Sequence, residues 1–426
     1  MTPSHSRPST PPHHPNFGIE MSSERIKSLM HLVLPEVSLM AIQRLPPFKS
    51  YNNRIYYLKG SRQSCDALEG ANSLEIEEYV LKINGRGFDA DKTHNEVSCL
   101  RLLEAFCHRV PAPKVIAWSR DGSSIGVSTR NQGGAKLLQF RTADENHNGW
   151  ILMTKVPGEP INLTEVNQSG LASLAVQLAD HVTDWRQHIP AQMYGGNLRF
   201  YEDDYRVAKP DITLSSADGL VRTDLSIRGM LGDGLKWSNG IATTEGYYRA
   251  RMENKLKVLE AEDTFAPNRS LAAPIRNLIQ HGLPTIDKSN PYANSFVFTH
   301  YDLSPRNVLI SGDPPQITGI VDFEFSGFFP PVDEFLNDYI GNSQDWTEEV
   351  YNAYLKRLEQ NGVPTPLQGI DPECWEKAFL IEQLLQSIAP WYLPGSFRNT
   401  ELEHELEKSK VLCHNLLERL GTEKSD

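Results

Sequence analysis

The sequence has few cysteines and none in a C-x-x-C pair. Five cysteines are scattered along 426 residues. An odd, scattered set argues against a disulfide scaffold and a zinc ribbon, and it favours a reducing compartment. Long hydrophobic runs are also missing, since no apolar stretch approaches the roughly 18 residues that a membrane span needs. The N-terminus lacks the apolar core of a secretory signal. We therefore expect a cytoplasmic protein with no membrane partner.

An excess of positive charge is missing too. Lys and Arg number 42 against 54 Asp and Glu, which gives a net charge of −12. Proteins that bind nucleic acid usually concentrate basic residues on one surface, so nucleic acid is excluded as the main partner. The acidic balance leaves room for a cationic small molecule, or for a nucleotide held by a few cations.

The first 17 residues are rich in Pro, Ser and His. Such a segment cannot bury enough apolar surface to order itself, so we predict a disordered tail over residues 1–17. The remaining length allows either two to four domains or one large unit of two lobes.

Two segments after the tail have the pattern of antiparallel strands, IYYLKG and SLEIEEYVLKING. The two-residue period of the second puts Val80 and Lys82 on one face and Tyr79, Leu81 and Ile83 on the other. A lysine beside a valine in such a strand needs an acidic partner or an anionic ligand.

Further elements follow in the first half. A helix is predicted over about 93–107 because Glu96, Leu100 and Leu103 fall on one stripe. A polar segment, 119–148, indicates a hairpin, and an apolar strand from Trp150 then leads to Val156-Pro157-Gly158, where a lobe is expected to end.

The second half is predicted to be mainly helical. Apolar residues recur at helical spacing in three segments, which are residues 171–185, 372–388 and 401–420. Residues 190–247 are rich in Gly and Asp with weak periodicity, so we predict mainly long loops there. Antiparallel strands followed by helices indicate an α+β protein with a small sheet lobe and a larger helical lobe.

The most specific motif also lies in the second half. It reads HYDLSPRN over residues 300–307 and is followed by an apolar hairpin that leads to Asp322. Phosphoryl transfer needs a carboxylate that orients the acceptor hydroxyl and metal ligands that neutralise the triphosphate. Asp302 suits the first role, while Asn307 and Asp322 offer the oxygen ligands that Mg²⁺ prefers. We expect His300 to stay inside and to hold the loop around Asp302.

These residues resemble the catalytic loop and the metal-binding strand end of the aminoglycoside phosphotransferase (choline-kinase-like) family. The resemblance covers about residues 40–395, and the polar tail and Pro-rich insertions are similar to those of fungal members. It implies a bilobal protein-kinase-like fold of the α+β class. A small antiparallel-sheet N-lobe would span 18–156, and a larger, mainly helical C-lobe over 157–426 would hold the catalytic loop and the acceptor pocket.

The resemblance also implies nucleotide-binding residues in the first lobe, with ATP between the lobes. YVLKI is similar to the family's lysine strand, so Lys82 would hold the α- and β-phosphates and Glu96 would pair with it. WILMTKVPGEPI is similar to the inter-lobe hinge, with Met153 behind the adenine. The backbone C=O of Thr154 and N–H of Val156 would then bond the adenine edge.

Two details of that match are weaker. Asn52 belongs to SYNNRIY, which is similar to the family's phosphate-covering loop but contains no G-x-G-x-x-G, so close approach of its backbone to phosphate is not guaranteed by glycine. Lys155, in the hinge, would point away from the nucleotide.

Simpler explanations of these residues stay open. Asp302 and Asn307 could be turn residues, and Lys82 could guard an edge strand. Thr93-x-x-Glu96 is a capping-box pattern, so Glu96 could reach back to the start of its helix.

Three further carboxylates lie outside the motif. Asp333-Glu334 follows two prolines and is expected to cap the next helix, with acceptor binding as the alternative. Glu382 shares a helix face with Trp375 and Phe379. It is expected to be a solvated carboxylate or, alternatively, to meet a cationic acceptor in an aromatic cleft.

The sequence therefore predicts an ATP-dependent, Mg²⁺-requiring O-phosphotransferase for a hydroxyl of a small molecule, with cationic acceptors among the candidates. A protein kinase is less favoured, because the Gly-rich loop, Asp-Phe-Gly and Ala-Pro-Glu are absent. A catalytically silent nucleotide-binding or partner-binding protein is the third hypothesis, and the complete set Asp302, Asn307 and Asp322 argues against it.

Overall fold

The structure is a computed structural model that describes most of the chain. The described residues are 14–421 except 47–48, 64–73, 87–89, 123, 129–134, 140–147, 201–212, 215–220, 223–224, 228, 232–240, 284–294 and 337–345. Most of the predicted tail, residues 1–13, lies outside them.

Contacts within the chain divide it into two compact units. Unit 1 consists of the described residues within Met1–Val97 and Pro113–Lys155. Unit 2 consists of those within Ser98–Ala112, Val156–Tyr201 and Ile212–Asp426.

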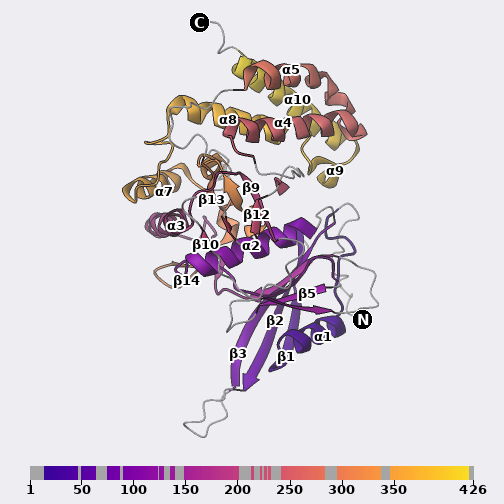
Figure 1. Ribbon diagram of the computed structural model, residues 1–426, viewed down its shortest axis with the longest axis vertical. Coiled ribbons are helices and arrows are strands. Elements are labelled where there is room, and N and C mark those ends of the chain that lie inside the picture. The colour runs from indigo at the N-terminus through magenta and orange to yellow at the C-terminus, as the bar shows by residue number, and fades with distance from the viewer. Residues whose placement is uncertain are drawn as a thin grey trace, which may run out of the picture. The chain divides into compact units, whose positions relative to one another are not determined.

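Unit 1 is built on one seven-stranded sheet (Figure 1), with the order β1-β2-β3-β7-β4-β5-β6. Its strands are β1 Val37–Arg44, β2 Asn53–Gln63, β3 Leu74–Asn84, β4 Val115–Ser119, β5 Ser124–Ser128, β6 Ala135–Gln139 and β7 Trp150–Thr154. Every neighbouring pair is antiparallel. The predicted pairing of the two strand segments is therefore confirmed, as is the hairpin within 119–148, which is β5–β6.

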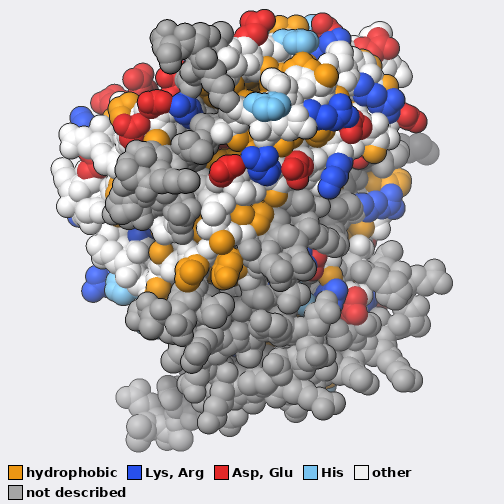
Figure 2. All heavy atoms as spheres, turned by 45° about the horizontal axis from the view of Figure 1, so that its top comes forward, with side chains coloured by type: hydrophobic (Ala, Val, Ile, Leu, Met, Phe, Trp, Pro, Cys, Tyr) orange, Lys and Arg blue, Asp and Glu red, His pale blue; other side chains and the backbone are white. Residues whose placement is uncertain are grey.

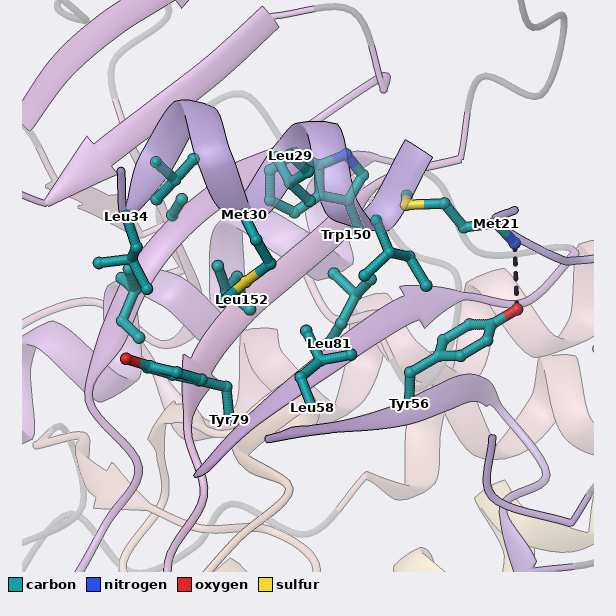
Figure 3. Close-up of a cluster of buried hydrophobic side chains, with 14 of the residues drawn as sticks. Met21, Leu29, Met30, Leu34, Tyr56, Leu58, Tyr79, Leu81, Trp150 and Leu152 are labelled. Atoms are coloured by element: carbon teal, nitrogen blue, oxygen red, sulfur yellow. Dashed lines mark hydrogen bonds between the residues drawn. The ribbon is translucent and has the colours of Figure 1, made fainter. Parts of the chain in front are cut away.

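One face of this sheet is covered by helix α1, Ser23–Val33. Ile26, Leu29, Met30 and Val33 of α1 belong to one buried cluster with side chains of β2, β3 and β7 (Figure 3). At the edge of the cluster, the backbone N–H of Met21 donates to the hydroxyl of Tyr56 over 3.1 Å. This arrangement satisfies the one polar group that Tyr56 brings into the core.

The side chains of strand β3 alternate between the hydrophobic core on one face of the sheet and the candidate site on the other. Tyr79, Leu81 and Ile83 are buried in the cluster under α1, as the sequence predicts. Val80 and Lys82 alternate with them, so they lie on the opposite face. In the antiparallel register Val80 is paired with Met153 of β7, which places Met153 on the same face as Lys82.

Helix α2, Ala90–Phe106, follows β3 and begins a little earlier than predicted. Its first residues contact the ends of β2 and β3: Lys92 Nζ donates to Asn53 Oδ1 over 2.8 Å, and Asn84 Nδ2 donates to Thr93 Oγ1 over 2.8 Å.

Unit 2 contains small antiparallel sheets that carry the HYDLSPRN segment. One has the order β15-β14-β8 and another the order β12-β9-β16-β13. The strands are β8 Glu159–Pro160, β9 Gly196–Phe200, β10 Thr213–Leu214, β11 Val221–Arg222, β12 Leu225–Ile227, β13 Val297–Thr299, β14 Val308–Ser311, β15 Gln316–Ile320 and β16 Gly327–Phe329. Four of them, β9 to β12, fall in 190–247, where we predicted mainly long loops. They have two to five residues each, too few to show a periodic pattern, and β9 also pairs with β16, about 130 residues later in the chain.

Helices make up the rest of unit 2. The α-helices are α3 Gln168–His188, α4 Thr244–Ala261, α5 Ala272–Asn277, α6 Asp333–Leu336, α7 Glu348–Gln360, α8 Pro372–Ser387, α9 Leu393–Ser396 and α10 Asn399–Gly421. Helical turns of other types are η3 Asp263–Leu271, η4 Leu278–Gly282, η5 Pro305–Asn307 and η6 Phe323–Phe325. Helices α4, α5, α8 and α10 pack together, as do α3 and α7 (Figure 1). The three predicted helical segments correspond to α3, α8 and α10.

Local signals explain where several helices begin. Asp371 caps α8 by accepting from the backbone N–H of Glu373 and of Cys374, each over 3.0 Å, and Pro372 occupies the first helical position. Asn167 caps α3 in the same way through Gly170 N–H over 2.8 Å. Side-chain oxygens thus satisfy the free N–H groups of the first turn.

The surface is mixed in charge where the structure describes it. On the face drawn in Figure 2, Lys and Arg side chains are interspersed with Asp and Glu side chains, which keeps the local field weak. Within the described ranges, no helix is long and apolar enough to cross a bilayer.

The core under α1 generates a stability prediction. Leu81 is fully buried, so Leu81→Ala removes packed methyl groups and should lower the free energy of unfolding by about 3 kcal/mol. Leu74, in the same strand, is 64% exposed, so Leu74→Ala should change it by less than about 0.5 kcal/mol. Urea unfolding of both variants measures the difference, and equal losses would show that the Leu81 face is not core.

Candidate active site

Lys82 and Glu96 form a buried ion pair in unit 1. The Nζ atom of Lys82 lies 2.7 Å from Glu96 Oε2, and the side chains are 6% and 3% exposed. The pairing expected between β3 and α2 is therefore present. The capping-box alternative is wrong, because α2 begins at Ala90 and Thr93 is already inside it, where its hydroxyl accepts from Asn84.

The end of β7 carries the predicted hinge residues of unit 1. Met153 is buried opposite Val80. The Thr154 hydroxyl accepts from Lys114 N–H over 2.9 Å, and the Thr154 N–H donates to Lys114 O over 2.9 Å. Lys155 Nζ binds Glu78 Oε2 at 2.9 Å. The hinge strand is thus fixed on both sides by neighbouring strands.

Val156 begins unit 2. The Val156 side chain packs against Gly319, which has no side chain of its own. A Cβ on Gly319 would lie only 2.7 Å from Val156 Cγ2. Gly158 follows with a φ of +104°, and a Cβ there would lie 2.7 Å from the carbonyl oxygen of Ile310. Only glycine fits this close approach of backbone to backbone.

A polar network holds the glycine-free loop that contains Asn52. The carbonyl oxygen of Asn52 accepts from Gly85 N–H over 2.9 Å and from Lys92 Nζ over 3.3 Å. Asn16 Nδ2 donates to the carbonyl oxygens of Ser50 and Asn53 over 2.8 and 2.7 Å. Buried side chains therefore define the loop's backbone.

The described end of the predicted tail belongs to this network. Residues 14–17 form a turn in which Asn16 is fully buried. Arg54 Nη2 donates to Asn16 O and Arg54 Nε donates to Ile19 O, each over 2.9 Å. No sequence pattern reveals this role, because an asparagine between a proline and a phenylalanine is typical of loops.

His300 and Asp302 belong to one turn of unit 2, directly after β13. His300 is fully buried, as expected. Its Nδ1 accepts from the N–H of Asp302 over 3.3 Å, so its Nε2 carries the proton and donates to Val321 O over 3.0 Å. The histidine thus connects the loop to the residue before Asp322.

Asn307 and Arg306 hold the Asp302 carboxylate. Asn307 Nδ2 donates to the backbone oxygen of Asp302 over 2.8 Å and to its Oδ2 over 3.1 Å, while Arg306 Nη2 donates to Oδ1 over 2.5 Å. The two bonds use the amide nitrogen of Asn307. Its amide oxygen therefore remains as the atom that can bind a metal ion.

Burial raises the pKa of Asp302 to about 6, against the lowering effect of Arg306, and the nearby Asp322 charge raises it further. A carboxyl group with this pKa is largely ionised at neutral pH and still readily accepts a proton. That behaviour suits a general base.

Asp322 is brought to the same place by its neighbour Val321. The Val321 N–H donates to Asn307 O over 2.9 Å, and its carbonyl oxygen accepts from His300. Asp322 itself adopts a φ of 71°, in the left-handed region that ordinary residues rarely use. The oxygen donors of Asn307 and Asp322 fit Mg²⁺, which takes oxygen ligands.

The three acidic residues outside the motif behave differently from expectation. Asp333 is fully buried and accepts from the hydroxyls of Tyr247 and Tyr248 over 2.8 and 2.9 Å. Glu334, also buried, binds Arg186 over 3.2 Å. The prediction that this pair caps a helix is therefore wrong, since both carboxylates are used in tertiary contacts.

Glu382 was expected to be solvated or to meet a cationic acceptor. It is 3% exposed, and both its oxygens bind Arg251, over 2.7 and 3.0 Å. Neither expectation holds, because the carboxylate is buried and already forms an ion pair with the guanidinium of Arg251.

A buried ion pair joins a lysine of the antiparallel sheet to a glutamate of the following helix, and a histidine anchors the aspartate loop in the mainly helical unit. Together these features define a kinase-like fold. The chain belongs to the phosphotransferase enzyme family (APH), whose profile matches residues 46–370. A search of curated proteins finds no match.

Solved structures share the fold at low sequence identity. The gentamicin complex of APH(2'')-IIa is 12% identical with a TM-score of 0.53, covering 93% of this chain and 97% of that one. ADP-bound APH(2'')-Ib is 13% identical with a TM-score of 0.53, covering 93% and 99%. The predicted fold class, an antiparallel-sheet N-terminal part and a helical C-terminal part, is confirmed.

The pKa of Asp302 implies a stability that depends on pH. Its folded value of about 6 lies above the ordinary 3.8. The contribution of Asp302 to the free energy of unfolding is therefore fully present below about pH 4, and it is lost as the pH rises through 6. Asp302→Asn avoids this loss, so its free energy of unfolding should exceed that of the wild type by up to about 3 kcal/mol at pH 7, but not at pH 4.

Urea unfolding across pH 4–8 measures this difference. Asp313→Asn, an exposed carboxylate of the β14–β15 hairpin, removes the same charge and serves as the control. A difference between Asp302→Asn and wild type that stays constant with pH would contradict the raised pKa.

Proposed function

We propose that the protein transfers the γ-phosphoryl group of ATP to a hydroxyl of a small molecule. The observation that carries the proposal is the arrangement of Asp302, Asn307 and Asp322 around one histidine-anchored turn. Family membership supports a phosphotransferase. The five scattered cysteines, none in a C-x-x-C pair, favour a reducing compartment such as the cytoplasm.

Asp302 acts on the acceptor in this proposal. Its carboxylate orients the acceptor hydroxyl and takes the proton as the new O–P bond forms and the bond between the γ-phosphorus and the ADP oxygen breaks. ADP leaves with the electron pair of that bond. Arg306 and Asn307 keep the carboxylate oriented, and its pKa of about 6 matches transfer near neutral pH.

Asn307 and Asp322 hold Mg²⁺, which supplies charge neutralisation on the phosphates. Lys82, oriented by Glu96, binds the α- and β-phosphates. Met153 lies behind the adenine, with the Thr154 carbonyl and the Val156 N–H as its hydrogen-bonding partners. Asn52 lies in the loop over the phosphates, whose backbone Lys92 and Asn16 fix without glycine.

The acceptor is a polar small molecule that carries a hydroxyl. Structures of similar fold hold gentamicin and streptomycin, and the net charge of −12 favours a cationic compound. Glu382 is excluded as the recognising carboxylate, because Arg251 already binds it.

Activity tests the proposal directly. The protein with MgATP and a collection of hydroxyl-bearing metabolites and aminoglycosides should yield a product whose mass rises by one phosphoryl group. Asp302→Asn should lower the rate about 10²–10⁴-fold with little change in nucleotide affinity, whereas Asp322→Asn should abolish Mg²⁺-dependent nucleotide binding. Asp313→Asn should leave both unchanged. Stabilisation by MgATP without any phosphorylated product would contradict the proposal.

The Lys82–Glu96 pair allows a second test. Lys82→Met/Glu96→Leu removes both charges of the buried pair together and not one of them alone, so the fold should survive. The affinity for MgATP should fall more than about tenfold. The matched control, Lys155→Met/Glu78→Leu, removes an ion pair from the surface of the same sheet. Titration calorimetry measures both, and unchanged affinity in the first variant would make Lys82 a structural residue only.

A further inference from the structure

Tyr301 has a backbone conformation that is costly for its residue type. It lies directly before Asp302 with a φ of 72°. Only glycine reaches this left-handed region freely, and a bulky aromatic residue there is strained. Such strain persists only where surrounding contacts enforce it, so the contacts of Tyr301 need an explanation.

The Tyr301 side chain contacts Phe329 and Arg251. Its ring packs on Phe329 of β16 with centroids 4.9 Å apart. Its hydroxyl accepts a hydrogen bond from Arg251 Nη2 over 3.0 Å. The ring contact is apolar and tolerates sliding, whereas the hydrogen bond fixes one atom, so the guanidinium sets the position of the side chain.

Arg251 is itself fixed from several sides. It is 1% exposed, and Glu382 of α8 binds it through two bonds of 2.7 and 3.0 Å. The ring of Tyr247 lies 5.1 Å from its central carbon. Asp333 of α6 lies 4.0 Å from its Nη1. The guanidinium therefore contacts residues of α6, α8 and its own helix α4. It cannot move without breaking buried hydrogen bonds.

We propose that Tyr301 is a positioning residue for the catalytic carboxylate: its hydroxyl, bound to the Arg251–Glu382 pair, enforces the left-handed backbone that presents Asp302. The proposal rests on the proposed phosphotransferase function. It also gives Glu382 a role, because its two bonds hold the arginine fork that Tyr301 needs.

The matched pair Tyr301→Phe and Tyr248→Phe tests the hydroxyl. Both remove one phenolic hydroxyl from the same polar cluster. The hydroxyl of the half-buried Tyr301 binds Arg251, whereas that of the buried Tyr248 binds Asp333. Amide hydrogen exchange of the full chain should be about tenfold faster in the peptide over 297–306 for Tyr301→Phe and unchanged there for Tyr248→Phe. Equal exchange of this peptide in wild type and Tyr301→Phe would overturn the proposal.

Kinetics separates positioning from folding. With MgATP alone, and water as the acceptor, Tyr301→Phe should lower kcat about tenfold with KM for MgATP within about twofold. Tyr248→Phe should change neither. A rise in KM with unchanged kcat would contradict a role through Asp302.

Glycine supplies the rescue. Because Tyr301→Gly adopts a φ of 72° without strain, its kcat should exceed that of Tyr301→Phe by about threefold or more. Arg251→Lys should lower kcat about tenfold in the wild type but less than about twofold beside Tyr301→Gly. Additive losses would overturn the proposal.

The two hypotheses fail separately. If the wild type hydrolyses no ATP and phosphorylates no acceptor, the proposed function falls, and the hydrogen exchange of the loop still decides whether Tyr301 anchors it. If ATP turns over normally in Tyr301→Phe, only the positioning role falls.

Discussion

Partly removing a carboxylate from water is the constraint on which the catalytic loop depends. Burial raises the pKa of Asp302, and Arg306 and Asn307 offset part of that rise by donating hydrogen bonds to the carboxylate. Those donors must stay in place, and this requires a rigid turn. His300 supplies the rigidity, since its two ring nitrogens join Asp302 to Val321. The buried histidine, the strand pairing and the placement of Asp322 thus follow from one electrostatic requirement.

Unit 1 meets the same requirement with a cation. Lys82 is held out of water on β3, and Glu96 compensates its charge. The alternation of β3 makes this possible, because Leu81 and its neighbours anchor the opposite face under α1 (Figure 3). The loop around Asn52 has side-chain anchors where glycines would otherwise let the backbone turn freely. Lys92 and Asn16 hold its carbonyl groups, so its shape is fixed by packing and not by intrinsic flexibility.

Sequence patterns predicted the features that depend on residues close together in the chain. The faces of β3, the cap of α8 and the spacing from His300 to Asn307 are local, and the structure reproduces them. The errors concern partners far along the chain: Arg251 and Glu382 are 131 residues apart, and Tyr247 and Asp333 are 86 apart. Asp333 follows prolines as a capping residue would, yet two tyrosine hydroxyls outcompete the helix end for its carboxylate. Periodicity carries no information on such pairs, and the pairing of the short strand β9 with β16 is hidden for the same reason.

The buried polar cluster around Arg251 is hard to explain by stability. Apolar residues of similar volume fill a core as well as a buried ion pair does, and often better, because desolvating charges is costly. What an apolar core cannot do is hold one atom in one place. The arginine fork binds Glu382 on one side and the Tyr301 hydroxyl on the other, and Tyr301 is the strained residue beside Asp302. These hydrogen bonds therefore orient the residue next to Asp302. The orientation of the Asp302 carboxylate in turn determines whether an acceptor hydroxyl can react.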